Sequence, residues 1–240
     1  MRVLLDRTAG PASPPTTPPP DDGQPLSDEQ LATAYATPSA DWLRVNMVTT
    51  LDGAATGADG LTGSVNNPAD RRVFAALRRA AEAIVVGAGT ARAEGYRPVD
   101  RPTVVVSRRA DVPERLRDGA PGSVLLVTCG GAEGLEAARA LLGDDQVLVL
   151  GDHAVDLTAL RPALAERELR TLLCEGGPHL LRDLLAAGAV DELCATVVPT
   201  LVGGDLPRIT GGGPVEVPLE LRLLLEEDGT LLGRWLVARA

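Results

Sequence analysis

Two glycine-rich turns in this chain could bind the phosphate groups of a ligand. The first is Gly87–Thr90, and the second is Glu175–Pro178, which follows the apolar run Thr171–Cys174. Glycine lets the backbone approach a phosphate closely, and the N-terminus of a following helix supplies free N–H groups. Each turn alone is better explained as an ordinary connection from strand to helix, and neither matches the GxGxxG fingerprint. The two together favour a dinucleotide, with its pyrophosphate at Glu175–Pro178.

Hydroxyl and arginine side chains follow another apolar run. Ser107, Arg108 and Arg109 come directly after Thr103–Val106. An arginine pair beside a hydroxyl suits the 2′-phosphate that distinguishes NADPH from NADH. The alternative is a solvated loop, which this short segment by itself favours.

Glu175 ends a predicted strand, so we expect it to face the ligand side of the sheet. A partly buried carboxylate must find a partner. That partner is either an NH group of a bound substrate or the N-terminus of the next helix, and the two interpretations are equally good.

Three other side chains also have two interpretations each. Asp52 is an active-site acid or part of a turn between strands. Arg78 is a clamp for a substrate phosphate or a surface arginine of a helix that begins at Pro68. His179 is a proton donor or, in better agreement with its place in the first turn of a helix, a residue that packs against the cofactor.

The composition excludes several classes of function. The formal net charge is −10 and the pI about 4.7, so nucleic acid and anionic membranes are poor partners. The chain contains no lysine, which removes Schiff-base chemistry. Widely spaced cysteines and two histidines give no zinc motif, so we expect no metal and buried free thiols at Cys129, Cys174 and Cys194. No apolar run has the length of a membrane span and no signal peptide is evident, so we expect a cytoplasmic protein.

The elements that position these residues follow from the hydrophobic pattern. From Leu43 onward, short apolar runs alternate with helical stretches, which predicts a mostly parallel sheet covered on both faces. Ligands bind outside the carboxyl ends of the strands in such sheets. The predicted strands are Leu43–Thr50, Ala83–Val86, Thr103–Val106, Val124–Thr128, Val147–Leu150 and Thr171–Cys174.

The two ends of the chain differ from this pattern. The runs Leu193–Val198, Leu221–Glu226 and Leu231–Ala238 have no long helical spacers, and Asp228-Gly229 is a strong hairpin signal, so we expect antiparallel strands at one edge of the sheet. Residues 1–25, rich in Pro, Ser and Thr from residue 10, are predicted to be a flexible tail. Residues 26–240 form the remaining domain, with a short capped helix before a core that starts at about residue 43.

Five segments resemble, in order and at family spacing, the reductase family of riboflavin biosynthesis. They are Val45–Gly53, Asp70–Phe74, Gly87–Tyr96, Cys174–Pro178 and Val198–Gly204. The family includes the C-terminal reductase domain of deaminase-reductases and stand-alone pyrimidine reductases of the actinobacterial type. Each segment alone is a weak match, but five in order are a strong one. The resemblance covers the chain from about Leu43 and implies a dihydrofolate-reductase-like fold.

The resemblance implies NADPH-dependent reduction of a ribosylaminopyrimidine phosphate, 5-amino-6-(5-phosphoribosylamino)uracil. Hydride would pass from the nicotinamide to the ribose C1′ carbon in its open imine form, and water or Asp52 would deliver the proton. We expect the substrate to be bound by Asp52, Thr62, Arg78 and Glu175. We expect NADPH to be bound by Thr50, Ser64, Gly87, Gly89, Thr90, Glu94, Ser107, Arg108, Gly176, Gly177, Pro178, His179 and Leu180.

Departures from the family pattern keep other functions open. The loop Gly60–Asn67 lacks an aromatic residue expected there, and Glu94 stands where aspartate is frequent. A dihydropterin or dihydrofolate substrate is one alternative, and a non-catalytic NADPH-binding scaffold is another. The chain lacks the H-x-E and PCxxC motifs of the zinc deaminases, so no deaminase activity is expected. The apolar run Leu219–Leu225, with the pairing of the family through its C-terminal strands, predicts a homodimer.

Overall fold

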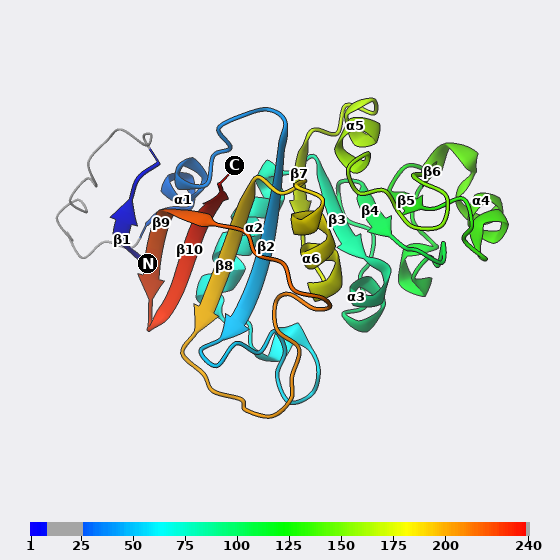
Figure 1. The fold of residues 1–240 in the computed structure, drawn as a ribbon. Helices are drawn as coiled ribbons and strands as arrows, with labels where there is room; N and C mark the ends of the chain where they lie inside the picture. The colour runs from blue at the N-terminus through cyan, green and yellow to red at the C-terminus, as the bar shows by residue number, and fades with distance from the viewer. Residues whose placement is uncertain (9–25, 239–240) are drawn as a thin grey trace.

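The computed structural model describes residues 1–8 and 26–238, which form one mixed sheet with helices on both faces (Figure 1). The sheet has ten strands in the order β1-β9-β10-β8-β2-β7-β3-β4-β5-β6. Neighbouring strands from β8 to β6 run parallel, and those from β8 to β1 run antiparallel. The predicted fold class is therefore confirmed, including the antiparallel strands at the C-terminal end.

The parallel strands are apolar runs identified in the sequence, although the run of the last one, Leu193–Val198, was expected among antiparallel strands at the edge and instead pairs parallel on one side and antiparallel on the other. These parallel strands are β2 (Trp42–Thr50), β3 (Ala83–Gly87), β4 (Thr103–Val106), β5 (Val124–Thr128), β6 (Val147–Val149), β7 (Thr171–Cys174) and β8 (Glu192–Val198). They are buried along most of their lengths, as strands covered on both faces must be. Their carboxyl ends point the same way, toward the lower edge of the sheet in Figure 1.

A hairpin joins the last two strands, β9 (Leu219–Glu227) and β10 (Thr230–Val237). Its two central residues both have positive φ, 51° at Asp228 and 78° at Gly229. An Asp-Gly pair tolerates this conformation, and such turns match the twist of antiparallel strands. The predicted hairpin is confirmed.

One strand lies where the sequence predicted only a flexible tail. β1 (Arg2–Asp6) pairs antiparallel with β9 and forms the edge of the sheet. Its partner strand lies more than 200 residues away in the sequence, with Arg2 opposite Glu226. No local sequence pattern therefore predicts the pairing. The Pro-rich part of the predicted tail, residues 9–25, lies outside the described residues.

Helices cover the two faces of the sheet. The α-helices are α1 (Asp28–Ala34), α2 (Pro68–Ala80), α3 (Ala88–Ala93), α4 (Leu135–Leu142), α5 (Leu160–Ala165) and α6 (Pro178–Ala186), with short 3-10 turns at Thr62–Ser64, Glu114–Leu116 and Asp144–Gln146. α1 and α2 share one apolar core, and α5 and α6 contribute to another. The cap predicted for the short first helix is present, with the Ser27 side chain accepting from the N–H of Gln30 at 3.2 Å. The Asn67 side chain caps α2 by accepting from the N–H of Asp70. Among the described residues, no helix is long and apolar enough to cross a membrane.

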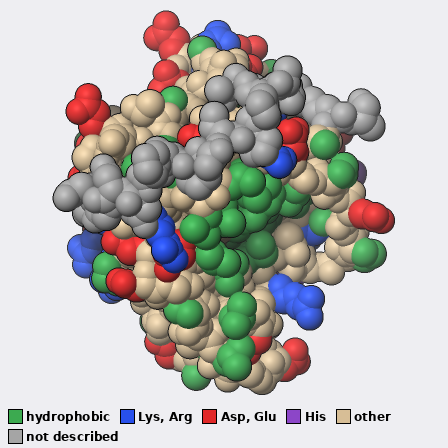
Figure 2. Space-filling model, turned by 90° about the vertical axis from the view of Figure 1, so that its left-hand side faces the viewer, with side chains coloured by type: hydrophobic (Ala, Val, Ile, Leu, Met, Phe, Trp, Pro, Cys, Tyr) green, Lys and Arg blue, Asp and Glu red, His purple; other side chains and the backbone are tan. Residues whose placement is uncertain are grey.

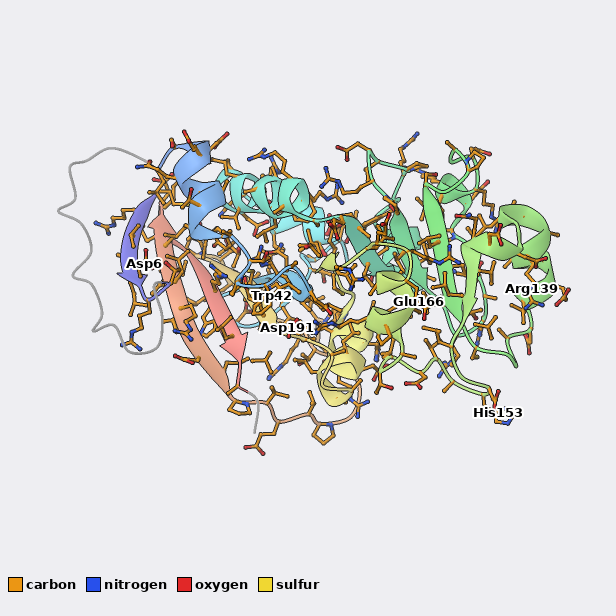
Figure 3. The ribbon with its side chains drawn as sticks, turned by 90° about the horizontal axis from the view of Figure 1, so that it is seen from above. Asp6, Trp42, Arg139, His153, Glu166 and Asp191 are labelled. Atoms are coloured by element: carbon orange, nitrogen blue, oxygen red, sulfur yellow. The ribbon has the colours of Figure 1, made fainter. Side chains whose placement is uncertain are left out.

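A buried ion cluster ties α1 to the sheet. Glu192 on β8 binds Arg44 on β2, at 2.6 Å, and Arg234 on β10, at 3.0 Å. Burial opposes ionisation of Glu192, but the two guanidinium charges outweigh it and hold its pKa below the usual value. Trp42 and Asp191 flank this region in Figure 3, where Trp42 donates to Glu192 from the start of β2. The three cysteines are free and buried, as predicted.

Candidate active site

A first cavity, of about 680 Å³, opens at the carboxyl ends of β3, β4 and β7. Three turns that follow these strands line it: Gly87–Thr90, Ser107–Arg109 and Gly177–Leu180. The sequence singled out all three for phosphate groups. The structure brings them together because parallel strands end at one edge of the sheet.

The glycines of these turns leave space beside the backbone that a side chain at the same positions would fill. Gly87 donates its N–H to the carbonyl of Gly176 at 2.8 Å, which holds the two turns against each other. A Cβ on Gly177 would lie 2.2 Å from Oγ1 of Thr90. Gly176 has a φ of +86°, a conformation that favours glycine. No side chain caps the first turn of α6, so its N–H groups remain available to an anion.

The arginine end of this cavity is positively charged. Arg108 and Arg109 line it, and the ion pairs of the described residues include neither side chain. Ser107 is buried, and its hydroxyl accepts from the N–H of Asp111 at 2.9 Å. Ser107 therefore shapes the turn, while the two guanidinium groups can bind an anion.

A second cavity, of about 660 Å³, adjoins the first. Both cavities are lined by Thr90, Gly177, Pro178 and His179, so these residues form a seam between them. A ligand in one cavity can thus contact a ligand in the other at the seam. His153, the other histidine, lines neither cavity.

One wall of the second cavity carries a charged network around Glu175. Arg78 donates to both carboxylate oxygens of Glu175, from Nε at 2.6 Å and from Nη2 at 2.7 Å. Tyr96 donates its hydroxyl to the same carboxylate at 2.6 Å. The hydrogen bonds and charge of Glu175 raise the pKa of Arg78, although burial opposes this. The sequence placed Glu175 and Arg78 at one site but did not predict that they bind each other.

Four residues that line the same cavity each carry a buried side-chain oxygen without a partner in the described part of the chain. The oxygens are Oδ1 of Asn46, Oδ1 of Asn66, Oδ1 of Asp70 and Oγ1 of Thr56, all buried and without a hydrogen-bond partner among the described residues. Buried polar atoms are nearly always paired, so unpaired oxygens on four residues that line one cavity are candidates for hydrogen bonds to a bound ligand or water. Burial raises the pKa of Asp70, although a hydrogen bond from Thr196 and the charge of Arg71 oppose it.

The turn after α3 places two side chains, Glu94 and Tyr96, in the second cavity. Gly95 has a φ of +65° and reverses the chain after the helix. Glu94, just before it, accepts from the N–H of Thr62 at 2.8 Å, while Tyr96, just after it, reaches Glu175. Glu94 therefore lies in the second cavity and not in the first, where the sequence had placed it.

Comparison with known proteins decides the family. The sequence model described as the RibD C-terminal domain matches residues 41–230. The chain belongs to this family. A 2,5-diamino-6-ribosylamino-4(3H)-pyrimidinone 5′-phosphate reductase from Methanothermobacter thermautotrophicus is 32% identical over 202 residues, which cover 78% of this chain and 92% of that protein. Riboflavin biosynthesis protein RibD from Mycobacterium tuberculosis is also 32% identical, but the chain spans only 47% of its length.

Solved structures show the same fold as this RibD C-terminal domain. A pyrimidine reductase-like protein from Corynebacterium diphtheriae superposes with a TM-score of 0.77 at 24% identity, covering 90% of this chain and all of that one. Riboflavin biosynthesis reductase from Saccharomyces cerevisiae has a TM-score of 0.64 at 16% identity, covering 86% and 94%.

Four expected site residues of this RibD-type chain line neither cavity: Thr50, Asp52, Ser64 and Gly176. Asp52 accepts from the hydroxyl of Thr50 and from the N–H groups of Val202 and Gly203, at 3.2 and 2.7 Å. Ser64 is bound by Asp59 and by a carbonyl of its own turn. The hydrogen bonds from Thr50 and Gly203 lower the pKa of Asp52. Thr50, Asp52 and Ser64 therefore stabilise the loops around the site and do not line it.

Sequence reasoning on this RibD-type chain missed four residues of the second cavity. Asn46, Asn66, Asp70 and Tyr96 were not proposed as site residues, although a signal in the sequence points to Asn46 and another to Asp70. Asn46 interrupts an apolar strand, and a polar residue there needs a partner. Asp70, Phe74 and Arg78 recur every four residues and so lie on one face of α2. Among residues 1–8 and 26–238, no group of acidic, Cys or His side chains could hold a metal ion.

Proposed function

We propose that the protein is an NADPH-dependent reductase of a ribosylaminopyrimidine phosphate in riboflavin biosynthesis. The observation that carries the proposal is the seam where the two cavities meet, because hydride transfer requires two ligands in contact. The first cavity suits a dinucleotide phosphate, and the second offers buried acceptors and an arginine. Relatives named as reductases of such a pyrimidine support the substrate class.

In this reaction the chain mainly binds and orients its two ligands. NADPH, when bound, supplies the hydride that reduces C1′ of the ribosyl group. The turns Gly87–Thr90 and Gly177–Leu180 would hold its pyrophosphate, and Arg108 and Arg109 its 2′-phosphate. The seam residues would exclude water from the reacting carbon, since Pro178 and Thr90 lie between the cavities.

The second cavity would recognise the pyrimidine and its ribosyl phosphate. The carbonyl oxygens of Asn46 and Asn66 can accept from ring and amino N–H groups. Arg78 can bind the phosphate or a ribosyl oxygen through Nη1, which the Glu175 hydrogen bonds leave unused. Asp70, whose pKa is raised, can donate a proton at a higher pH than an ordinary aspartate. We propose this role for Asp70 in place of Asp52.

The test is direct turnover by the purified protein. NADPH absorbance is followed with 5-amino-6-(5-phosphoribosylamino)uracil and, separately, with its 2,5-diaminopyrimidinone counterpart. Oxidation of NADPH with either compound supports the proposal, and dihydrofolate in a third reaction tests the alternative substrate class. Absence of oxidation with both ribosylaminopyrimidines, by a protein that binds NADPH, contradicts it.

The choice of cofactor is tested at Arg108 and Arg109. Replacing both by alanine is expected to weaken NADPH binding by about 30- to 100-fold, which corresponds to the loss of charge-assisted hydrogen bonds. NADH lacks the 2′-phosphate, so its affinity should change by less than about threefold. Calorimetric titration of both cofactors measures this. An equal loss of affinity for NADH and NADPH would show that these two arginines do not bind the 2′-phosphate.

A substitution of Asp52 tests whether this residue anchors a loop of the second cavity. The segment after Gly203 carries Pro207 and Arg208 into the second cavity, and Ala55 donates to the carbonyl of Pro207 at 2.7 Å. Asp52→Asn weakens the anchor of this segment, so we expect the KM for the pyrimidine to rise by roughly 3- to 10-fold, in the range of one ordinary hydrogen bond. NADPH affinity should be unchanged. Asp144→Asn is the control, since its exposed carboxylate pairs with Arg139 and lines neither cavity. A fall in kcat at constant KM would instead indicate a proton donor.

We further propose that the protein is a cytoplasmic homodimer. Figure 2 shows hydrophobic side chains gathered on the face that presents the β1 edge. Leu4 on β1, Leu219 on β9 and Leu231 on β10 are 37–43% exposed. An apolar patch of this kind is typical of an interface. Free buried cysteines agree with a reducing compartment. Light scattering on the purified protein checks the dimer, and a monomer mass contradicts it.

A further inference from the structure

We infer that Tyr96 is a positioning residue. Its hydroxyl holds the Glu175 carboxylate in the orientation that lets Glu175 bind Arg78 through both oxygens. The inference rests on the proposed function, since it concerns how the substrate cavity presents its charged wall. It assigns a role to one of only two tyrosines in the chain. Neither the composition nor the family resemblance gave Tyr96 a role.

The geometry around Glu175 supports this role. Its Oε2 accepts from both Tyr96, at 2.6 Å, and Nη2 of Arg78, at 2.7 Å, while Oε1 accepts only from Nε of Arg78 among the described residues. The Glu175 side chain is 2% exposed, so water cannot replace a lost donor. Without the phenol hydroxyl, the carboxylate would be held from the Arg78 side alone.

The ring of Tyr96 also restricts Arg78. The guanidinium carbon lies 4.5 Å from the centre of the Phe74 ring and 5.9 Å from that of Tyr96. Two aromatic faces and a bidentate carboxylate thus fix the plane of the guanidinium. With Nε and Nη2 bound to Glu175, Nη1 is the nitrogen left to meet an anionic group of the substrate.

Tyr96 is itself held firmly as a donor. The turn at Gly95 sets its backbone, and its N–H donates to the carbonyl of Ala91 at 2.9 Å. Burial, and then the negative charge of Glu175, raise the pKa of Tyr96 well above its usual value. The phenol therefore keeps its proton throughout the working range of a reductase and donates only toward the carboxylate.

The experiment compares Tyr96→Phe with a matched Tyr35→Phe control. Tyr35 is buried in the core beside α2, and its hydroxyl has no hydrogen-bond partner among the described residues. Wild-type turnover of the pyrimidine is measured first, because its absence would refute the proposed function and not this inference. We expect Tyr96→Phe to raise the pyrimidine KM by about 10-fold or more, as for a lost hydrogen bond to a charge. NADPH affinity should stay within about twofold, and Tyr35→Phe should leave both constants unchanged.

A double-mutant cycle separates positioning from a general loss of packing. Arg78→Lys cannot form the bidentate bond, so adding Tyr96→Phe to it should raise KM by less than about twofold. The same Tyr96→Phe substitution in an Asp52→Asn background should show its full effect. An unchanged KM in the Tyr96→Phe single variant would overturn the inference. So would additive effects with Arg78→Lys.

Discussion

Replacing Glu175 by alanine is expected to lower kcat/KM for the pyrimidine by at least about a hundredfold, which corresponds to about 2.7 kcal/mol. The carboxylate is the buried partner of Arg78 and Tyr96. Removing one member of a buried pair leaves the other uncompensated, a cost of about 3–5 kcal/mol before discounting the 30% exposure of Arg78. The charged wall of the second cavity would lose its orientation, and the first cavity would not change.

NADPH binding separates this effect from unfolding. We expect the dissociation constant of NADPH, measured by fluorescence titration, to stay within about twofold of wild type, because Glu175 lines only the second cavity. Glu136→Ala is the control, since Glu136 forms an exposed ion pair with Arg139 on α4 and lines neither cavity. Loss of NADPH affinity in Glu175→Ala would show that the residue belongs to the cofactor site.

Asp70→Asn is expected to abolish most turnover and yet stabilise the folded protein at neutral pH. The carboxyl is 1% exposed and its pKa is raised, so the folded state disfavours its ionised form. Between the ordinary value of 3.8 and the raised pKa, the folded protein binds more protons than the unfolded chain. Stability therefore falls as pH rises through that window, and the loss is complete above the raised pKa.

The amide removes this pH dependence while keeping an acceptor for Thr196. At neutral pH we expect the melting temperature of Asp70→Asn to rise by about 2–4 °C, as for ~1 kcal/mol in a domain of this size. Below pH 3.8 the difference should vanish. We expect kcat to fall by about a hundredfold, in the range for loss of a general acid. Asp28→Asn, an exposed aspartate also in a first helical turn, is the control. Wild-type kcat in Asp70→Asn would contradict its proposed role.

Most of the fold could be predicted because its signals are local. The apolar strands, the Asn67 and Pro68 helix start and the Asp228-Gly229 turn each depend on a few neighbouring residues. β1 could not be predicted, because its pairing with β9 joins the two ends of the chain. Its five residues alternate too weakly to indicate a strand without that partner.

The part of the site that could be predicted is the part set by glycine turns and by the direction of the strands. The turns at Gly87 and Gly177 follow parallel strands, so their meeting at one edge follows from the topology. The partners of Glu175 could not be read from the sequence, because Tyr96 and Arg78 reach it from separate elements. The hydrogen-bond partners of Asp52 could not be read from the sequence for a related reason. Its loop partners Val202 and Gly203 lie 150 residues further along the chain, and nothing local shows that they satisfy its carboxylate.

The short strand β1 limits how this protein can associate. An uncovered edge strand invites other chains to extend the sheet, and natural proteins counter this with short, bulged or charged edges. β1 has all three features: five residues, an irregularity between Val3 and Leu5, and the charged Arg2 and Asp6 at its ends. It occupies the outer side of the long, leucine-rich β9. In the proposed homodimer, the two copies should therefore meet through the apolar face of the sheet and not by joining their edges into a continuous sheet.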